Sequence, residues 1–511
     1  MSNTATRPTV GVVGMGYVGL TLTAALARKG YTVYGVDVQP SVIQALSQGR
    51  PHIFEPGVAE VFAEHAGSSI FVSDRLPDTV DAAVLSVSTP VDETTRQPDL
   101  RNLAAAAEQV ARWCRPDTLV VVRSTVPVGT SRRVVLPPLR AAWAPDGGPE
   151  VRLVMAPERT IQGQALRELV ELPQVIGGLD AESLRAGLAL FAGLADRLVP
   201  VSSLEAAELV KLSNNCHTDL IYAYGNEVAL IAERHGLDPL EVIRATNLDY
   251  PRPDLAKPGY VGGGCLSKDP YIMLASAADG AGAGAGAAAG ARPEPFLVGR
   301  ARELNEHLPV HVATTVVDLL RSARGEAAGA RLAVLGWAYK GWPPTDDMRG
   351  TPIAAMMPVF RAAGLTVLGH DPMVDEDIIR RYGGEPVSLD KAFSDTDAVL
   401  VINDHPDYRA LQVDTMLAAA GAHGPKVIYD SWRIFEESAV TAAGVRYAGI
   451  GYLPPAPPAS AADAAEPAGA AGAAGAAEPA GAAGAAGAAG AADGVEPATV
   501  VAGTVAAGAS A

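Results

Sequence analysis

The stretch TVGVVGMGYVGLTLTAALARKGYTVYGVD, from Thr9 to Asp37, decides the fold. Its apolar run at 10–13 predicts a strand, three closely spaced glycines follow at once, and the Ala- and Leu-rich run up to residue 27 predicts a helix. A second apolar run at 32–36 predicts another strand, which ends in an acid. This order of strand, glycine turn, helix and strand predicts the start of a doubly wound α/β domain.

The glycine turn has the spacing of a phosphate-binding loop for a dinucleotide. Glycines permit a tight turn and let a pyrophosphate approach the helix N-terminus, where unpaired N–H groups favour an anion. An acid at the tip of the second strand would bind the adenosine ribose and repel a 2′-phosphate, so we expect NAD rather than NADP. The alternative is a turn and an acid without a ligand. The residues expected at the cofactor are Gly14, Gly16, Tyr17, Val18, Gly19 and Asp37.

Apolar strands alternate with helical stretches at both ends of the chain, whereas the middle is mostly helical. Such continuous apolar strands indicate parallel sheets that are covered on both faces. The fold class that we expect is α/β, with two Rossmann-like doubly wound domains joined by a helical central domain that contains a long helix. The expected domains are residues 1–202, 203–325 and 326–453. Two Ala/Gly-rich stretches, 278–291 and 454–511, lack large side chains and are predicted to be disordered.

Composition excludes several classes of protein. The 511 residues include 40 Lys and Arg against 57 Asp and Glu, a net charge of −17, which argues against nucleic-acid or anionic-membrane partners. No run of about 18 large apolar residues predicts a membrane span, and the N-terminus lacks a secretory segment. The three cysteines lie far apart, so we expect a cytoplasmic protein without a disulfide scaffold or a bound metal.

Two Ser/Thr-Pro motifs each end a predicted strand of the first domain. They contain Thr89 and Pro90 in the first motif, and Ser124 and Thr125 in the second. Ligands of open parallel sheets lie beyond the carboxyl ends of the strands, so these hydroxyls would line the nicotinamide side. Ser/Thr-Pro is also common in turns, and both interpretations stand.

Candidate reacting residues occur in three separate pieces of the chain. Glu158 and Arg159 directly follow a predicted strand. Lys211 and Asn215 are four residues apart and project from one helix face. The third piece, VGGGCLSKDP, places Cys265 after three glycines that let the backbone approach a ligand closely.

Each piece also has an alternative without chemistry. Lys211 would pair with Glu208, Glu158 would cap or pair at the surface, and a lone cysteine is usually a small buried apolar residue. However, Cys265 is close in sequence to Lys268 and Asp269, and a cysteine in a glycine loop beside a lysine fits a thiolate better than a core residue.

Eight motifs in order resemble the UDP-glucose/GDP-mannose dehydrogenase family. They are GMGYVGL, STVPVGT, PER-x3-G, ELVKLSNN, VGGGCLSKDP, ARELNEHLP, LGWAYKG-x4-DDMRGTP and DAVLVINDH, and the resemblance runs from Val10 to about Gly451. It implies an enzyme that oxidises the CH₂OH of a nucleotide sugar to a carboxylate with two NAD⁺. It also implies a homodimer built on the long central helix and a role in polysaccharide precursor synthesis.

The resemblance implies a role for each candidate residue. Cys265 would add to the aldehyde and form a thiohemiacetal, which a second hydride transfer converts to a thioester that water releases. Lys211 and Asn215 would stabilise oxygen charge, and Asp269 would work with a water as acid and base. Glu158 and Thr125 would position or activate water. Arg349 would lie at the cofactor, and the substrate would contact Glu158, Arg159, Lys211, Asn215, Arg252, Gly262, Gly263, Lys340 and Arg433.

Two smaller sequence features bear on the identity of the sugar, and they favour different substrates. The motif Pro157-Glu158-Arg159 resembles the branch that acts on UDP-N-acetylmannosamine and related 2-acetamido sugars, whereas Lys268 in CLSKDP resembles the UDP-glucose branch. We expect UDP-N-acetylmannosamine, with UDP-glucose 6-dehydrogenase as the alternative. The rivals of other classes are a β-hydroxyacid dehydrogenase that transfers a single hydride and a binder of nucleotide sugars without catalysis.

Overall fold

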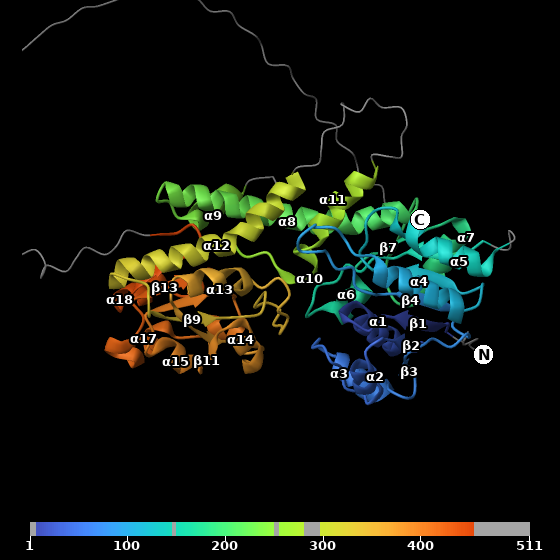
Figure 1. Cartoon of the computed structure of the whole chain (residues 1–511), viewed down its shortest axis with the longest axis horizontal. Helices are drawn as coiled ribbons and strands as arrows, with labels where there is room; N and C mark the ends of the chain where they lie inside the picture. The colour runs from blue at the N-terminus through green and yellow to red at the C-terminus, as the bar shows by residue number, and fades with distance from the viewer. Residues whose placement is uncertain (1–6, 146–149, 250–254, 281–296, 454–511) are drawn as a thin grey trace, which may run out of the picture. The chain divides into compact units, whose positions relative to one another are not determined.

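A computed structural model describes residues 7–145, 150–249, 255–280 and 297–453 (Figure 1). Arg252, most of the Ala/Gly stretch at 278–291 and the stretch at 454–511 lie outside the described residues. The expected fold class is confirmed, because two sheets, each with helices, flank a group of long helices. In the part of the chain that is described, no helix is both long and apolar enough to cross a membrane.

The first sheet begins with the predicted strand–turn–helix–strand unit. Its strand order is β3-β2-β1-β4-β5-β6-β7-β8, so the order reverses between β1 and β4. The strands are β1 (Thr9–Val13), β2 (Thr32–Val36), β3 (Ile70–Ser73), β4 (Ala82–Leu85), β5 (Leu119–Val122), β6 (Leu153–Met155), β7 (Gln174–Gly178) and β8 (Leu198–Val201). Ligands of such sheets bind at the carboxyl ends of the strands beside this reversal.

The helices of the first domain connect these strands and cover the sheet. They are α1 (Tyr17–Arg28), α2 (Pro40–Ser47), α3 (Val58–His65), α4 (Arg101–Trp113), α5 (Leu136–Trp143), α6 (Ala165–Glu171) and α7 (Ala181–Phe191), with a short π-helix at Ser131–Val135. One pair of strands differs from the expected parallel sheet, because β6 and β7 are antiparallel. The physical reason is that the short α6 packs against α1 instead of crossing the sheet, so the chain enters β7 from the end at which β6 stops.

Helices of very different lengths form the middle of the chain, which was predicted to be helical. They are α8 (Leu204–Arg234), α9 (Pro239–Asn247), α10 (Gly263–Leu266), α11 (Asp269–Gly280) and α12 (Leu297–Arg324). The Ser203 hydroxyl caps α8 by accepting from the Ala206 N–H, and Gly236, with a φ of 66°, follows its end. A buried ion pair of 2.8 Å between Arg302 of α12 and Asp219 of α8 holds these two helices together.

The second sheet is parallel throughout, and its strand order is β11-β10-β9-β12-β13-β14. The strands are β9 (Arg331–Leu335), β10 (Thr366–His370), β11 (Glu385–Pro386), β12 (Ala398–Val401), β13 (Val427–Asp430) and β14 (Arg446–Ala448). Its helices are α13 (Ile353–Ala362), α14 (Glu376–Tyr382), α15 (Leu389–Phe393), α16 (Pro406–Arg409), α17 (Val413–Ala420) and α18 (Glu437–Ala442).

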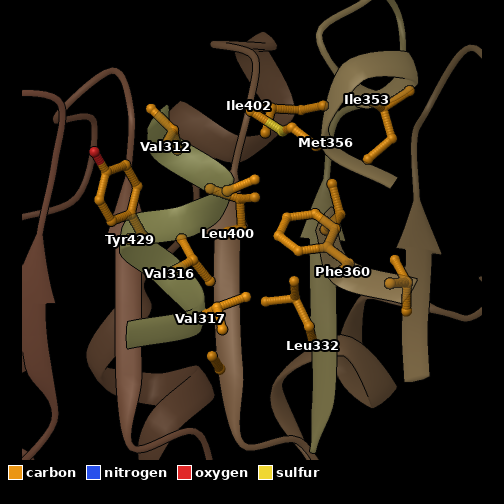
Figure 2. Packing of buried hydrophobic residues seen from close by; sticks show 14 of the residues in the cluster. Val312, Val316, Val317, Leu332, Ile353, Met356, Phe360, Leu400, Ile402 and Tyr429 are labelled. Carbon is orange, nitrogen blue, oxygen red and sulfur yellow. The ribbon is translucent and has the colours of Figure 1, made fainter. Parts of the chain in front are cut away.

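The long helix α12 supplies part of the core of the second α/β domain. Figure 2 shows Val312 and Val316 of α12 among strand residues such as Leu400, with Phe360 of α13 beside Leu332. All five side chains are at most 1% exposed. Helix α12 packs on both α8 and this core, and its Arg302 donates to the Leu266 carbonyl beside Cys265. Helix α12 therefore connects the cysteine loop to the second sheet.

Candidate active site

The three glycines of the turn after β1 have different surroundings. Gly14 has a φ of +93°, a conformation that side chains rarely adopt. A Cβ on Gly19 would lie 1.9 Å from the Gly14 carbonyl oxygen, so this glycine lets α1 pack against the turn. A Cβ on Gly16 would meet no atom within 4 Å. The turn is therefore open at Gly16, beside the start of α1, which fits the pyrophosphate of a dinucleotide.

Asp37 is held beside the same turn. Its Oδ2 accepts a hydrogen bond from the Met15 N–H at 3.0 Å, and its Oδ1 accepts from the Gln39 N–H at 2.9 Å. The carboxylate is half-buried and keeps further lone pairs, which would accept the ribose hydroxyls of a bound NAD. The turn and the acid together fit NAD.

The two Ser/Thr-Pro motifs lie at neighbouring strand ends. The Ser124 hydroxyl donates to the Val87 carbonyl at 2.7 Å, so this side chain ties the segment after β5 to the segment after β4. The Thr89 hydroxyl is buried and makes no hydrogen bond within the described residues. Thr125 is half-buried and Pro90 is exposed. Ser124 thus has a turn role, whereas Thr89 keeps a free donor and acceptor.

The structure brings together the residues expected from α8 and from the cysteine loop. Lys211 Nζ lies 3.5 Å from Asn215 Oδ1, and the Asn215 amide donates to Asp269 Oδ2. Lys268 Nζ donates to Asp269 Oδ1 at 2.8 Å. Lys211 is 6% exposed and Asp269 is fully buried. Two positive charges, an amide and a carboxylate therefore share one small cluster.

Glu208 does not pair with Lys211, so that alternative is wrong. Glu208 is 1% exposed; its Oε1 accepts from the Ser131 N–H at 2.8 Å and its Oε2 accepts from the Gly129 N–H. Burial raises the pKa of this carboxyl, against the lowering effect of the two N–H donors. Glu208 attaches α8 to the loop after β5, so it sets the position of Lys211 relative to the first sheet.

The predicted resting thiolate of Cys265 is not supported. Loss of hydration raises the pKa of this thiol, and Asp269 raises it further; Lys211, Lys268 and Arg349 oppose them without reversing the direction. The residue is exposed by surface area although protein surrounds it closely. A thiol at an opening touches solvent and still loses most of its hydration, and this loss raises its pKa. Cys265 rests as a neutral thiol.

The glycines before Cys265 pack against the second α/β domain. A Cβ on Gly262 would lie 2.2 Å from the Gly350 carbonyl oxygen, and one on Gly263 would lie 2.8 Å from the Tyr339 ring. At Gly264 it would lie 2.7 Å from the Arg349 guanidinium carbon. The close approach that the glycines permit in the structure is thus to protein, and it brings Arg349 next to Cys265. Asp347 holds Arg349 there through two oxygens.

Glu158 is buried, so a surface cap or surface pair is wrong. Its Oε2 accepts from Arg123 at 2.6 Å, and its Oε1 accepts from the N–H groups of Arg159 and Thr160, each at 2.7 Å. Burial by itself raises the pKa of Glu158, but Arg123 and the N–H donors together hold it below its usual value. Glu158 is therefore ionised, a good acceptor for a water hydrogen and a weak base. Sequence reasoning missed Arg123; the signal was a cation at the end of the buried run LVVV.

The other predicted cations have different surroundings. Arg159 donates to Asn214 of α8 at 3.0 Å and to the Pro173 carbonyl at 3.1 Å. Lys340 donates to the Gln162 carbonyl at 2.7 Å, which joins the second α/β domain to the loop that carries Glu158. Burial lowers the pKa of Lys340 to about 8.

Arg433 does not join the cysteine cluster through any contact between described residues. Its guanidinium lies 3.4 Å from Asp238 and 3.2 Å from Glu437, and it stacks over the Tyr452 ring at 4.0 Å. Neighbouring carboxylates thus already compensate its charge. Arg252 lies outside the described residues, and the described residues hold no group of His, Cys, Asp and Glu suited to a metal ion.

Sequence reasoning also missed Glu55. This carboxylate is 4% exposed, and the hydroxyl of Tyr17, a predicted cofactor residue, donates to it at 2.8 Å. The N–H groups of Gly163 and Ala165 donate to the same carboxylate at 2.7 and 2.8 Å. The available signal was an acid directly before the Pro-Gly that begins a helix.

Comparison with known proteins gives matches along almost the whole described chain. Models of the UDP-glucose/GDP-mannose dehydrogenase family match as the NAD binding domain at residues 8–195, the central domain at 205–289 and the UDP binding domain at 333–437. UDP-N-acetyl-D-mannosamine dehydrogenase of Pyrococcus horikoshii is 30% identical over 86% of this chain and 99% of its own length.

Two further relatives carry other substrate names. NDP-N-acetyl-D-galactosaminuronic acid dehydrogenase of Ralstonia nicotianae is 30% identical over 80% of this chain and 93% of its own length. The solved structure of a UDP-glucose dehydrogenase from Pyrobaculum islandicum has a TM-score of 0.74 and 26% identity, over 89% of this chain and 100% of that one. The relatives agree on the class of enzyme and differ in the sugar.

Proposed function

This chain belongs to the UDP-glucose/GDP-mannose dehydrogenase family, and from that premise we propose that it oxidises the C6 hydroxyl of a UDP-sugar to a carboxylate in two steps. It is an NAD-dependent nucleotide-sugar dehydrogenase. The observation that carries the two-step reaction is the position of Cys265, whose thiol feels the charges of both Asp269 and Lys211. Asn215 contacts each of these two residues.

A nucleophile is needed because an aldehyde does not give up its hydrogen as hydride until one adds to its carbon, and Cys265 is suited to this role. When bound, NAD accepts one hydride from carbon in each of the two oxidation steps. Between them, the Cys265 sulfur adds to the aldehyde carbon and forms a thiohemiacetal, and its oxidation leaves a thioester. Water then attacks the thioester carbonyl, and the carboxylate leaves as the carbon–sulfur bond breaks.

The other candidate residues have separate tasks in this scheme. Because the thiol is neutral at rest, its proton must leave as sulfur attacks, and we assign that proton to Asp269 through a water. Lys211 and the Asn215 amide stabilise the negative charge that develops on the C6 oxygen. The ionised Glu158 orients the attacking water together with Thr125.

For the sugar, we propose UDP-N-acetylmannosamine, with the uronate destined for polysaccharide precursor synthesis. Two of the relatives reported above, each 30% identical, are named for 2-acetamido sugars, which supports this substrate. The UDP binding domain supports uracil as the base. UDP-glucose is the second candidate, favoured by the structural relative from Pyrobaculum islandicum.

We further propose a homodimer in which α8 packs against its copy. Ile221, Tyr224 and Ile231 follow one another at helical spacing and are 39%, 59% and 51% exposed. An apolar stripe of this kind on a long helix is suited to a partner helix. Sedimentation of the unaltered chain tests this proposal.

The reaction is tested by counting NADH at 340 nm for each molecule of UDP-sugar consumed. UDP-N-acetylmannosamine, UDP-N-acetylgalactosamine and UDP-glucose are each incubated with NAD⁺. We expect two NADH per sugar and a uronate product; one NADH per sugar would favour the single-hydride rival, and binding without absorbance change the non-catalytic one. Cys265→Ala should abolish uronate formation, while Cys114→Ala, at a buried cysteine of the first domain, should not.

A further inference from the structure

One buried carboxylate joins the cofactor turn to the loop that carries Glu158. Glu55 Oε2 accepts from the Tyr17 hydroxyl at 2.8 Å and from the Gly163 N–H at 2.7 Å, and its Oε1 accepts from the Ala165 N–H at 2.8 Å. Tyr17 is the first residue of α1, directly after Gly16, and Ala165 is the first residue of α6. The two ends of this contact therefore lie 148 residues apart in the chain (165 minus 17) and meet on a single side chain.

The hydrogen bonds of Glu55 are buried and persist over the working pH range. Glu55 is 4% exposed, so water compensates poorly for a hydrogen bond lost from it. Burial and the neighbouring Glu55 raise the pKa of Tyr17 far above its usual value, so the phenol remains a donor at any working pH. The same loop includes Gln162, whose carbonyl accepts from Lys340 of the second α/β domain.

We propose that Glu55 transmits the binding of NAD to the sugar-side loop. A cofactor on the open glycine turn fixes the start of α1 and the Tyr17 hydroxyl, and Glu55 passes that restraint to the backbone at 163–165. The loop that holds Glu158 is then already ordered when the sugar arrives, so each ligand strengthens the binding of the other by the same factor. Glu55 is a positioning residue in this scheme, and the inference rests on the proposed function.

The coupling is measured with NADH and the UDP-sugar that the unaltered chain oxidises, a pair that cannot react because the cofactor is already reduced. The Kd of the sugar is determined with and without saturating NADH. We expect NADH to lower it by roughly 5-fold or more in the unaltered chain, in the ordinary range of allosteric coupling. In Glu55→Gln and Tyr17→Phe this ratio should fall towards 1.

The two substitutions act on the link in different ways. Glutamine at 55 keeps the shape but replaces one acceptor oxygen with an NH₂, which must then face a backbone N–H of Gly163 or Ala165. Tyr17→Phe removes the hydroxyl only and leaves both loop contacts of the carboxylate. Glu60→Gln, at an exposed acid of α3, is the matched control and should keep the full coupling.

The outcomes separate this inference from the proposed function. Full coupling in both Glu55→Gln and Tyr17→Phe would overturn the inference. It would also be overturned if the variants melted at a lower temperature and bound both ligands more weakly while the ratio of sugar Kd values without and with NADH stayed unchanged. That result would show that Glu55 only stabilises the fold. If the unaltered chain forms two NADH per sugar and shows a ratio of 1, this inference falls alone. If it oxidises no UDP-sugar, the proposed function falls and this inference with it.

Discussion

The buried pair of Arg123 and Glu158 gives the sharpest quantitative prediction. The two side chains are 1% and 8% exposed and lie 2.6 Å apart. Arg123 also donates to the Ala156 carbonyl and to Gln174 Oε1. Arg123→Met leaves Glu158 buried with only its two N–H donors, and removal of one partner from such a pair costs about 3–5 kcal/mol.

The pH dependence of the variant follows from the same contacts. In the unaltered chain the pKa of Glu158 is below its usual value, so its contribution is present above the unfolded pKa and is lost as pH falls through the folded one. Without Arg123, burial dominates and the folded pKa rises. The carboxyl then favours folding only while it is protonated, so the variant should recover part of its lost stability as pH is lowered from 7 towards the unfolded value of about 4.3.

Urea unfolding of both chains at several pH values measures this difference. Arg132→Met is the matched control, because Arg132 pairs with Glu205 at 2.7 Å while the side chains are 45% and 30% exposed. An exposed pair contributes about 0–1 kcal/mol. A loss below about 1 kcal/mol in Arg123→Met, or an equal loss at every pH, would refute the reasoning.

Three further predictions follow from the site. The rate at which iodoacetamide alkylates Cys265 should rise with pH through an apparent pKa above the ordinary value of about 8.5. Asp269→Asn should lower that pKa by removing a nearby negative charge, and an unshifted profile in the variant would contradict the effect of Asp269 on the thiol. Gly16→Ala should weaken NAD binding with little change in the melting temperature, whereas Gly19→Ala should lower the melting temperature because its Cβ would lie 1.9 Å from the Gly14 carbonyl oxygen. Calorimetry with and without NAD distinguishes the two variants, and an equal fall in melting temperature in both would be evidence against an open turn at Gly16. Reductive methylation of Lys340, followed by mass spectrometry, should rise through pH of about 8, well below the range of an ordinary lysine near 10.4, and a rise only above pH 10 would show that its burial has been misjudged.

Local patterns predicted the parts of the molecule that depend on neighbours in the chain. The glycine turn, the strand on each side of it and the start of α1 follow from sterics within residues 9–37. The 31-residue helix α8 was predictable because it lacks proline and ends near Gly236. The spacing of Lys211 and Asn215 placed them on one face of that helix, and the structure has their polar atoms 3.5 Å apart.

Contacts between distant parts of the chain could not be predicted from such patterns. Glu208 had a lysine three residues away, yet it binds backbone N–H groups at 129 and 131. Arg433 matched a ligand-side position, yet its contacts are with Asp238 and Glu437. A polar side chain takes the partners that are present where it becomes buried, and spacing along the chain does not specify which ones those are.

The amino-acid sequence by itself thus determined the α/β class, the NAD turn and the residue types of the chemistry, because each depends on short-range sterics or on recognisable motifs. Tertiary structure alone decided that Cys265 rests as a thiol, that Glu158 is ionised and that Glu55 joins two loops. The physical reason is that protonation states and buried hydrogen bonds depend on solvation and on charges brought close by folding. These quantities exist only once the chain has packed.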